Sequence, residues 1–203
     1  MGYLTLLYAH NSCAIIYNLK KIYHNNIKWY VVVESHTDGL STSNSAACGG
    51  LFRNYRGFVC GVFVQWLGEE TTYFAEFSAV IIAVEIAFAQ GWNRIWFEID
   101  SSITLLNFFR PDYVPPWRLR RRWERCLELL KGMEFRASHI YKEGNVPVDV
   151  LSNMALAYDD FTWWGYEIPE IRGAILANRL GLPMYRFCWC FVLNSFGCIW
   201  SRF

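Results

Sequence analysis

One segment constrains the fold more than any other. Residues 74–90 carry apolar side chains at helical spacing on nearly every side. A helix that is apolar around its whole circumference must be buried, so other elements have to cover it. Hydrophobic residues make up 54% of the 203 residues and charged residues 18%, which excludes a disordered chain and supplies a full core. We therefore expect a folded domain built around this helix.

Strands and further helices are expected on both sides of this helix. Runs of β-branched and aromatic residues predict strands at 29–33, 49–52, 58–65, 95–99 and 135–141. Apolar periodicity and capping residues predict further helices at about 102–109, at 118–130 and from about 148 onward. This order predicts an α/β fold. Its mixed five-stranded sheet has three antiparallel strands, then two parallel strands joined by crossovers, with helices on its faces.

The pattern divides the chain into three zones. Residues 1–27 show no clear period and are expected to form an irregular N-terminal extension. Residues 28–157 carry the predicted strands and helices. Residues 158–203 are rich in aromatic side chains, with Gly and Pro between them, and are expected to form a C-terminal extension.

Charge and cysteine usage limit the partners. The net charge is +1, so attraction to a nucleic acid needs a local basic patch, and arginines cluster at residues 118–125. A solvated helix face explains this cluster equally well. The seven cysteines form no CxxC pair, which favours reduced thiols in an intracellular protein of the nucleus or cytoplasm. The longest apolar stretch, near residues 188–200, is too interrupted to span a bilayer, so no membrane partner is expected.

Four acidic residues stand at the ends of the predicted elements. Asp38 follows the first strand, Glu76 is placed in the first turn of the apolar helix, Asp100 ends the fourth strand, and Asp149 begins the last helix. A carboxylate in an apolar segment is costly unless something pairs with it, so a bound cation would explain Glu76 and Asp100.

Each acid also has a purely structural interpretation. Asp38-Gly39 is a common turn, Glu76 would favour a helix N-terminus electrostatically, and Asp100 and Asp149 could each cap the helix that follows. All four together, in this order on an α/β chain, favour a shared site. Two Mg²⁺ ions about 4 Å apart can activate a water and stabilise a leaving oxygen in phosphodiester hydrolysis. Mg²⁺ prefers oxygen ligands and keeps several waters, so a few carboxylates suffice.

Five short motifs follow one another along the chain. They are Thr37-Asp38-Gly39, Cys48-Gly49-Gly50-Leu51-Phe52-Arg53, Ala75-Glu76, Glu98-Ile99-Asp100-Ser101, and the segment from His139 to Asn145 with Asp149. In this order they resemble the ribonuclease H type 1 fold. More closely, they resemble the plant ribonuclease H-like domains found singly or beside the reverse transcriptases of non-LTR retrotransposons. The resemblance covers about residues 29–157.

The resemblance implies a set of roles for these residues. Asp38, Glu76, Asp100 and Asp149 would be Mg²⁺ ligands, with Mn²⁺ as a possible substitute, and His139 would assist proton transfer or product release. The partner would be an RNA–DNA hybrid, whose RNA strand the domain cuts. No small-molecule cofactor is expected, and the chain is expected to be a monomer. The expected nucleic-acid contacts are Asn145, Arg118, Arg121 and Arg122, although Asn145 also suits a turn.

Two departures keep other functions open. Residues 40–47 lack the Gly-Asn-Pro-Gly stretch of cellular ribonucleases H, which affects how the backbone there would contact the 2′-hydroxyls of RNA. No stretch of these 203 residues resembles the polymerase domain that often precedes this module in the family. The alternatives are a non-catalytic nucleic-acid-binding remnant of a retroelement, favoured by the altered loop, and a protein-interaction domain on the same fold, favoured by the aromatic C-terminal zone.

Overall fold

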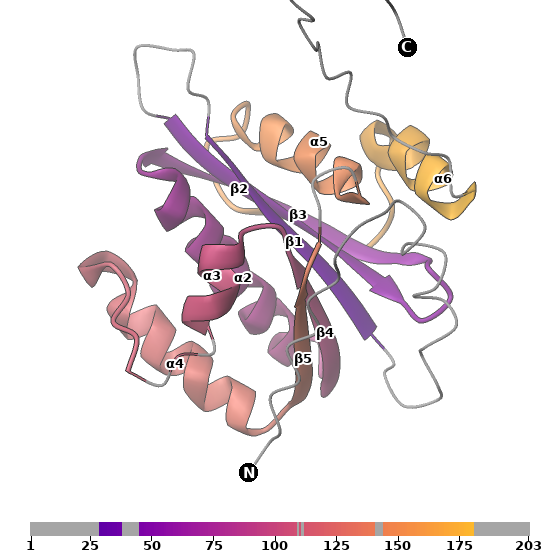
Figure 1. Ribbon diagram of the computed structural model, residues 1–203. Coiled ribbons are helices and arrows are strands. Elements are labelled where there is room, and N and C mark those ends of the chain that lie inside the picture. The colour runs from indigo at the N-terminus through magenta and orange to yellow at the C-terminus, as the bar shows by residue number, and fades with distance from the viewer. Residues whose placement is uncertain (1–28, 38–44, 109, 111, 141–143, 181–203) are drawn as a thin grey trace, which may run out of the picture.

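The protein is built on one mixed sheet with helices on both faces (Figure 1). The computed structural model describes residues 29–37, 45–108, 110, 112–140 and 144–180, and for 29–37 it describes the backbone alone. Helices α2, α3 and α4 contribute to the hydrophobic cluster on one side, and α5 and α6 contribute to the cluster on the other. The predicted α/β fold is confirmed.

The elements follow the predicted order. The strands are β1 Trp29–Thr37, β2 Ser45–Asn54, β3 Val59–Glu69, β4 Arg94–Ile99, β5 Glu134–His139 and β6 Thr162–Trp164. The α-helices are α2 Thr72–Ala89, α3 Ser102–Phe108, α4 Arg120–Lys131, α5 Val146–Ala155 and α6 Arg172–Leu180. Two short 3-10 helices, η1 Trp117–Leu119 and η3 Pro169–Ile171, precede α4 and α6.

The sheet has the order β5-β4-β1-β2-β3-β6. β1, β2 and β3 are antiparallel neighbours, β4 runs parallel to β1, and β5 runs parallel to β4. This is the predicted arrangement of three antiparallel and two parallel strands. The sixth strand, β6, pairs antiparallel with β3 and comes from the C-terminal zone, where no strand was predicted.

Helix α2 is the centre of the larger core, as its apolar sequence predicts. The Thr71 hydroxyl accepts a hydrogen bond from the backbone N–H of Phe74 at 3.1 Å and so caps the helix. Past the other end, Gly91 has a φ of 69°, a conformation that favours glycine. By length and composition α2 could cross a membrane, but 61% of its apolar window is buried inside the domain, as expected of a central helix.

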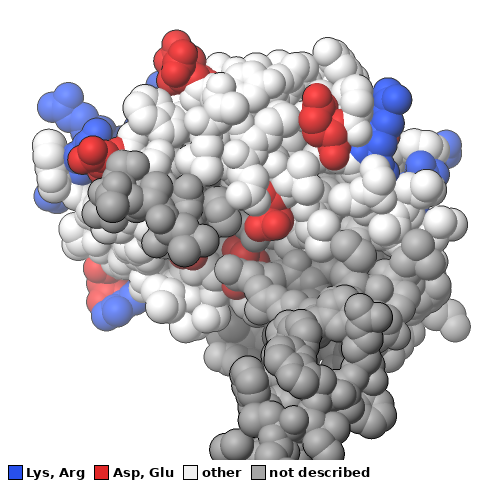
Figure 2. Space-filling model, turned by 90° about the horizontal axis from the view of Figure 1, so that it is seen from above, with Lys and Arg blue, Asp and Glu red and all other residues white. Residues whose placement is uncertain are grey.

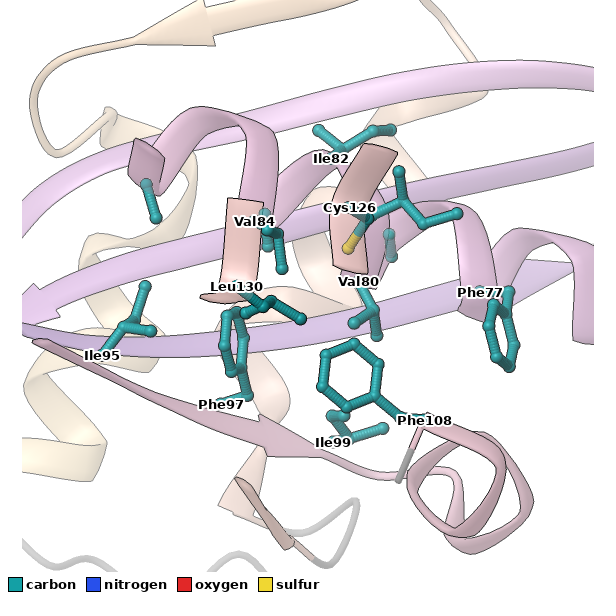
Figure 3. Packing of buried hydrophobic residues seen from close by; sticks show 14 of the residues in the cluster. Phe77, Val80, Ile82, Val84, Ile95, Phe97, Ile99, Phe108, Cys126 and Leu130 are labelled. Carbon is teal, nitrogen blue, oxygen red and sulfur yellow. The ribbon is translucent and has the colours of Figure 1, made fainter. Parts of the chain in front are cut away.

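The larger core lies between the sheet and three helices. Val80 of α2 lies near Phe97 and Ile99 of β4, and Phe77 lies farther along the same cluster (Figure 3). Phe108 of α3 and Cys126 and Leu130 of α4 complete it. All of these side chains are buried. Aromatic residues of this core pair at ring-centroid distances such as 5.2 Å between Phe77 and Trp123.

The smaller core covers the other face of β1–β3. Leu151 of α5 and Ile171 of η3 are fully buried there together with Leu51 and Val62 of the sheet. Ile175 of α6 belongs to the same cluster. Residues 158–180, which fall in the predicted C-terminal extension, therefore add a strand to the sheet edge and a helix to this core.

Candidate metal centre

The candidate site lies where the parallel strands end. β1, β4 and β5 run in the same direction, so their carboxyl ends meet at one edge of the sheet. Asp100 directly follows β4, and His139 is the last residue of β5. Asp38, the predicted acid after β1, lies outside the described residues.

Asp100 is half-buried at the end of β4. The next residue, Ser101, caps α3, because its hydroxyl accepts a hydrogen bond from the backbone N–H of Thr104 at 3.2 Å. Ser101 therefore caps α3. The structural interpretation of Asp100 as the cap of this helix is not needed. The Asp100 carboxylate stands beside this cap at the end of an otherwise buried strand.

His139 lies next to Asp100 across the parallel pair β4–β5. Its Nε2 is 2.9 Å from the backbone carbonyl oxygen of Asp100. A carbonyl can only accept, so Nε2 carries the proton in this hydrogen bond. The ring is exposed, which leaves it accessible from solvent at the same edge as the carboxylate.

Glu76 is tied to the segment after Asp100. The hydroxyl of Thr104, which is fully buried in α3, donates a hydrogen bond of 2.8 Å to Glu76 Oε2. This bond brings the α2 carboxylate to within one helical turn of Ser101. Sequence reasoning missed Thr104, since a threonine in a short helix gives no pattern that points to a neighbouring helix.

The position of Glu76 within α2 differs from the prediction. The helix begins at Thr72, two residues earlier than the apolar pattern indicates, so Glu76 lies beyond the first turn. The interaction of a carboxylate with the helix dipole falls off within the first turn. The electrostatic explanation of Glu76 as a helix-start residue is therefore weakened, and its bond to Thr104 provides a specific partner instead.

Asp149 lies in the first turn of α5 and is exposed. Asn145 occupies the N-cap position, where its backbone carbonyl accepts from the N–H groups of Val148 and Asp149 at 2.9 and 3.2 Å. Asp149 is thus inside the helix and does not occupy the cap position. The Asn145 side chain is fully buried, and neither of its amide atoms has a hydrogen-bond partner in the described part of the chain.

Helix α5 packs closely on the sheet near the level at which β4 ends. A Cβ on Gly49 of β2 would lie 2.9 Å from Leu151 Cβ, so glycine is required for this approach. Gly49 pairs with residue 34 of β1, and residue 33 pairs with Ile99 of β4. Leu151 therefore lies over the sheet level at which β4 ends, and Asp149 is two residues away from it.

These positions bring Glu76, Asp100, His139 and Asp149 to the same end of the fold. Within the described residues, no three His, Cys, Asp or Glu side chains form a group close enough to hold a metal ion. The donor chemistry nevertheless fits Mg²⁺, because the acids offer carboxylate oxygens and no thiolate accompanies them. Acidic side chains lie near the middle of the face in Figure 2, and Lys and Arg lie toward its margins.

The arginine cluster at residues 118–125 contains two kinds of side chain. Some form ion pairs within the domain, and others are exposed to solvent. Arg118 pairs with Glu70, and Arg122 makes two hydrogen bonds of 2.6 and 3.2 Å to the Glu85 carboxylate of α2. Arg121 and Arg125 are exposed, one turn apart on α4, and form no ion pair with the described residues. Three arginines were predicted to contact nucleic acid. Of these, Arg118 and Arg122 form ion pairs, and Arg121 forms none with the described residues.

Comparison with known proteins identifies the same domain. A family model described as reverse transcriptase-like matches residues 36–155. A protein of Arabidopsis thaliana named as a candidate ribonuclease H protein is 29% identical over 128 residues. That match covers 62% of this chain and 20% of the relative, so the chain spans about a fifth of the length of the curated relative it matches.

Solved structures share the fold. Ribonuclease H1 from the archaeon Halobacterium salinarum is 25% identical, with a TM-score of 0.55 over 64% of this chain and 97% of that one. LC11 ribonuclease H1, crystallised with an RNA/DNA hybrid, has the same TM-score and coverage at 19% identity. The N-terminal ribonuclease H domain of the Mycobacterium tuberculosis protein Rv2228c gives a TM-score of 0.57 over 65% of this chain and 95% of that one, at 17% identity.

Proposed function

Because the chain belongs to the reverse transcriptase-like family, a ribonuclease H-like family related to ribonuclease H1, we propose that it cuts the RNA strand of RNA–DNA hybrids. The observation that carries this proposal is the arrangement around Asp100. His139 is bonded to the Asp100 carbonyl, and the Thr104 hydroxyl holds Glu76 beside the helix that follows. Two acids and a histidine from three separate segments of the chain therefore lie toward the same end of the sheet.

The acids would hold two Mg²⁺ ions, with Asp100 and Glu76 as the central ligands and Asp149 at the exposed side. When bound, such ions supply an activated water and stabilise the leaving oxygen of the phosphodiester. The contribution of the chain is orientation. Thr104 fixes the rotamer of Glu76 by donating to Oε2, which leaves the other carboxylate oxygen, Oε1, for a metal ion.

His139 is proposed to assist a proton transfer. Its Nε2–H is held by the backbone carbonyl of Asp100, the residue that we propose as a metal ligand. The ring is exposed, so it is accessible to a substrate in solution. Positioned proton transfer of this kind contributes typically about 10²–10⁴-fold to a reaction rate, which makes His139 a contributor to catalysis but not its main source.

A second candidate function is binding of nucleic acid without cleavage. The specific observation in its favour is the exposed pair Arg121 and Arg125, whose charges are available for phosphate contacts. Both functions use these arginines. The alternatives differ in whether the carboxylates are needed, because a binding remnant would hold the hybrid equally well without them.

The test is a cleavage assay on four labelled substrates of one sequence: RNA–DNA hybrid, double-stranded RNA, double-stranded DNA and single-stranded RNA. With Mg²⁺, the proposal expects endonucleolytic cuts in the RNA strand of the hybrid and no cleavage of duplex DNA. Glu76→Gln should abolish cleavage while hybrid affinity in the presence of EDTA stays unchanged. Hybrid binding without any cleavage by the wild type would replace the proposal with the second function.

A further inference from the structure

Exposed aromatic and basic side chains gather around the turn between β2 and β3. Tyr55 and Phe58 of this turn are 69% and 49% exposed, so both rings offer area to a partner. Arg56 lies between them in the sequence and is exposed, and so is Arg179 near the end of α6. We call these four residues the turn patch.

The turn is held in one conformation by its own hydrogen bonds. The Asn54 side-chain oxygen accepts from the backbone N–H of Arg56 at 2.9 Å and from that of Phe58 at 3.1 Å. The Gly57 N–H donates to the Asn54 carbonyl at 2.8 Å, and the Asn54 N–H donates to the Phe58 carbonyl at 2.9 Å. Gly57 has a φ of 78°, a conformation that favours glycine. An ordered turn loses little freedom when it binds a partner, which favours binding.

Each exposed ring of the turn patch lies beside a guanidinium group. Arg56 Cζ is 5.3 Å from the centre of the Tyr55 ring, and Arg56 Nε donates to the Tyr55 hydroxyl at 2.9 Å. Arg179 Cζ is 4.9 Å from the centre of the Phe58 ring, although these two residues come from α6 and the turn. Positive charge and aromatic surface are therefore in contact at both rings.

The described residues do not neutralise the charge of the turn patch. Neither Arg56 nor Arg179 forms an ion pair with them. Six other arginines of the described residues do form such pairs: Arg94, Arg110, Arg118, Arg120, Arg122 and Arg172. No Asp or Glu occurs at residues 45–68 or within α6. A negatively charged partner is therefore complementary to the patch.

Single-stranded nucleic acid matches both properties of the turn patch. Its bases present flat faces that stack on aromatic rings, and its phosphates pair with arginine. In a duplex the bases stack on one another, and only their edges are accessible in the grooves. An acidic peptide would pair with the arginines but would bring no flat group to Tyr55 and Phe58. The patch therefore fits a single strand better than a duplex or an acidic peptide.

The turn patch and the candidate metal centre lie toward opposite ends of the sheet. Asn54, the last residue of β2, pairs with the first residue of β1, whereas Ile99 at the end of β4 pairs with residue 33. These two levels are about 13 Å apart along β1, at about 3.3 Å per residue, and the turn continues beyond the first of them. A strand bound at the turn patch would therefore not compete for the carboxylates.

We infer that the turn patch is a second binding site, for single-stranded nucleic acid. Tyr55 and Phe58 stack on bases, and Arg56 and Arg179 contact phosphates. The inference goes beyond the proposed function, because binding at the patch needs neither a metal ion nor the carboxylates. In a chain that cuts hybrids, the patch would hold an unpaired strand that extends from the hybrid.

The experiment measures the fluorescence anisotropy of a labelled single-stranded RNA of about 12 nucleotides, a length within the site sizes of single-strand binders. The full chain is titrated in EDTA, so that no strand is cut. Two further probes of the same length separate the possible partners. An abasic strand keeps the phosphates and lacks the bases, and a polyglutamate peptide carries negative charge alone. The variants are Tyr55→Leu/Phe58→Leu and Arg56→Ala/Arg179→Ala.

Each variant has a control elsewhere on the molecule. Phe88→Leu removes a ring of α2 that is 53% exposed. Arg94→Ala/Arg110→Ala removes the same charge as the arginine variant, from two residues that form ion pairs with Glu134 and Asp112. Thermal unfolding shows which variants are folded before any probe is added.

We expect Tyr55→Leu/Phe58→Leu to bind the RNA at least about tenfold more weakly than the wild type, because two stacked bases lose their platform. Its affinity for the abasic strand should equal that of the wild type. Arg56→Ala/Arg179→Ala should weaken binding of both strands and lower the slope of log K against log salt by about 1, because phosphate contacts are lost. Both controls should bind as the wild type does.

Four results would overturn the inference. They are no binding of the RNA by the wild type, equal wild-type affinity for the RNA and the abasic strand, unchanged RNA affinity in Tyr55→Leu/Phe58→Leu, and polyglutamate bound as tightly as RNA. The last result would assign the patch to an acidic peptide. Should the double variant not fold, Tyr55→Leu decides alone: a loss of about fivefold or more supports the inference, and unchanged affinity overturns it. None of these readouts involves cleavage, so failure of the inference and failure of the proposed function are distinguishable.

Discussion

At the residue scale, one hydrogen bond involves each of Glu76 and Asp100. The Thr104 hydroxyl donates to the Glu76 carboxylate, and the His139 ring donates to the Asp100 backbone carbonyl. Their apolar surroundings indicate from sequence that both carboxylates need a partner. The sequence does not show that Thr104 donates to Glu76 or that His139 contacts the Asp100 backbone, because both contacts join residues 28 to 39 positions apart. Contacts between residues so far apart in the sequence depend on how the helices and strands pack, and a local sequence pattern does not predict that packing.

Thr104 is predicted to be a positioning residue for Glu76. Thr104→Val keeps the shape of the side chain and removes the donor to Oε2. We expect the cleavage rate to fall about tenfold or more and the free energy of unfolding to change by about 1 kcal/mol, because a typical hydrogen bond contributes that much. Thr104→Ser, which keeps the hydroxyl, is the control and should restore most of the activity. Equal rates for wild type and Thr104→Val would show that Glu76 needs no such support.

The buried cysteines are predicted to be inert thiols. Burial raises the pKa of Cys48 and of Cys126 from 9.0 to about 12. At pH 8 both should resist iodoacetamide in the native protein and react in denaturant, as read by peptide mapping, with half-buried Cys60 reacting earlier. Rapid native labelling of Cys48 would contradict the core packing.

The same pKa shifts set the direction of a pH effect on stability. Unfolded thiols ionise above about pH 9, whereas the buried thiols stay protonated until about pH 12. Their contribution to the free energy of unfolding is therefore complete below pH 9 and is lost as the pH rises from 9 toward 12. Replacing Cys48 by alanine should make the decline of stability over that range less steep.

At the element scale, the sequence predicts the order and type of nearly every element from β1 to α5. Apolar periodicity predicts α2, and the apolar run at residues 95–99 predicts β4, because local patterning and burial agree there. A run of β-branched and aromatic residues also predicts β1. The ends are less well predicted: β2 and β3 extend beyond the apolar runs that indicate them. β6 and α6 were missed, since a three-residue strand has no period and is defined by its pairing with β3.

The docking of β6 on β3 depends on a glycine. A Cβ on Gly61 would lie 2.1 Å from Cη2 of Trp163, so Gly61→Ala must displace the indole ring. We expect a loss of about 1–3 kcal/mol in the free energy of unfolding, measured by urea denaturation, as found when extra methyl groups are forced into a packed site. Gly165→Ala, which meets no heavy atom within 4 Å, is the matched control. Equal stabilities of the two variants would mean that β6 does not pack as described.

At the scale of the whole molecule, charge is distributed so that the chain is nearly neutral overall but locally uneven. Arg118 and Arg122 of the arginine cluster are used in ion pairs with Glu70 and Glu85, which join α4 and the segment before it to α2 and its start. Arg121 and Arg125 remain exposed on α4. This division could not be predicted from the run of arginines, since it depends on which side of α4 faces α2.

Hybrid affinity is predicted to depend on this exposed pair. Replacing Arg121 and Arg125 by alanine should weaken hybrid binding and lower the slope of log K against log salt by about 1–2, because each phosphate contact releases about one counterion. Fluorescence anisotropy at several salt concentrations measures both. Lys131→Ala at the other end of α4, where the lysine pairs with Glu128, is the control and should leave the slope unchanged. An unchanged slope in the double variant would place the hybrid elsewhere on the surface.

The central claim is that this fold cuts RNA in a hybrid through metal-binding carboxylates. The most direct measurement is the initial rate of RNA-strand cleavage as Mg²⁺ is titrated, compared between the wild type and Asp100→Asn. The account predicts a wild-type rate that rises with Mg²⁺ and saturates, and a rate for Asp100→Asn that is lower by at least about 10²-fold at every concentration, since removal of one stabilising group can cost that much. Equal rates for the two proteins, or no cleavage by the wild type at any Mg²⁺ concentration, would contradict it.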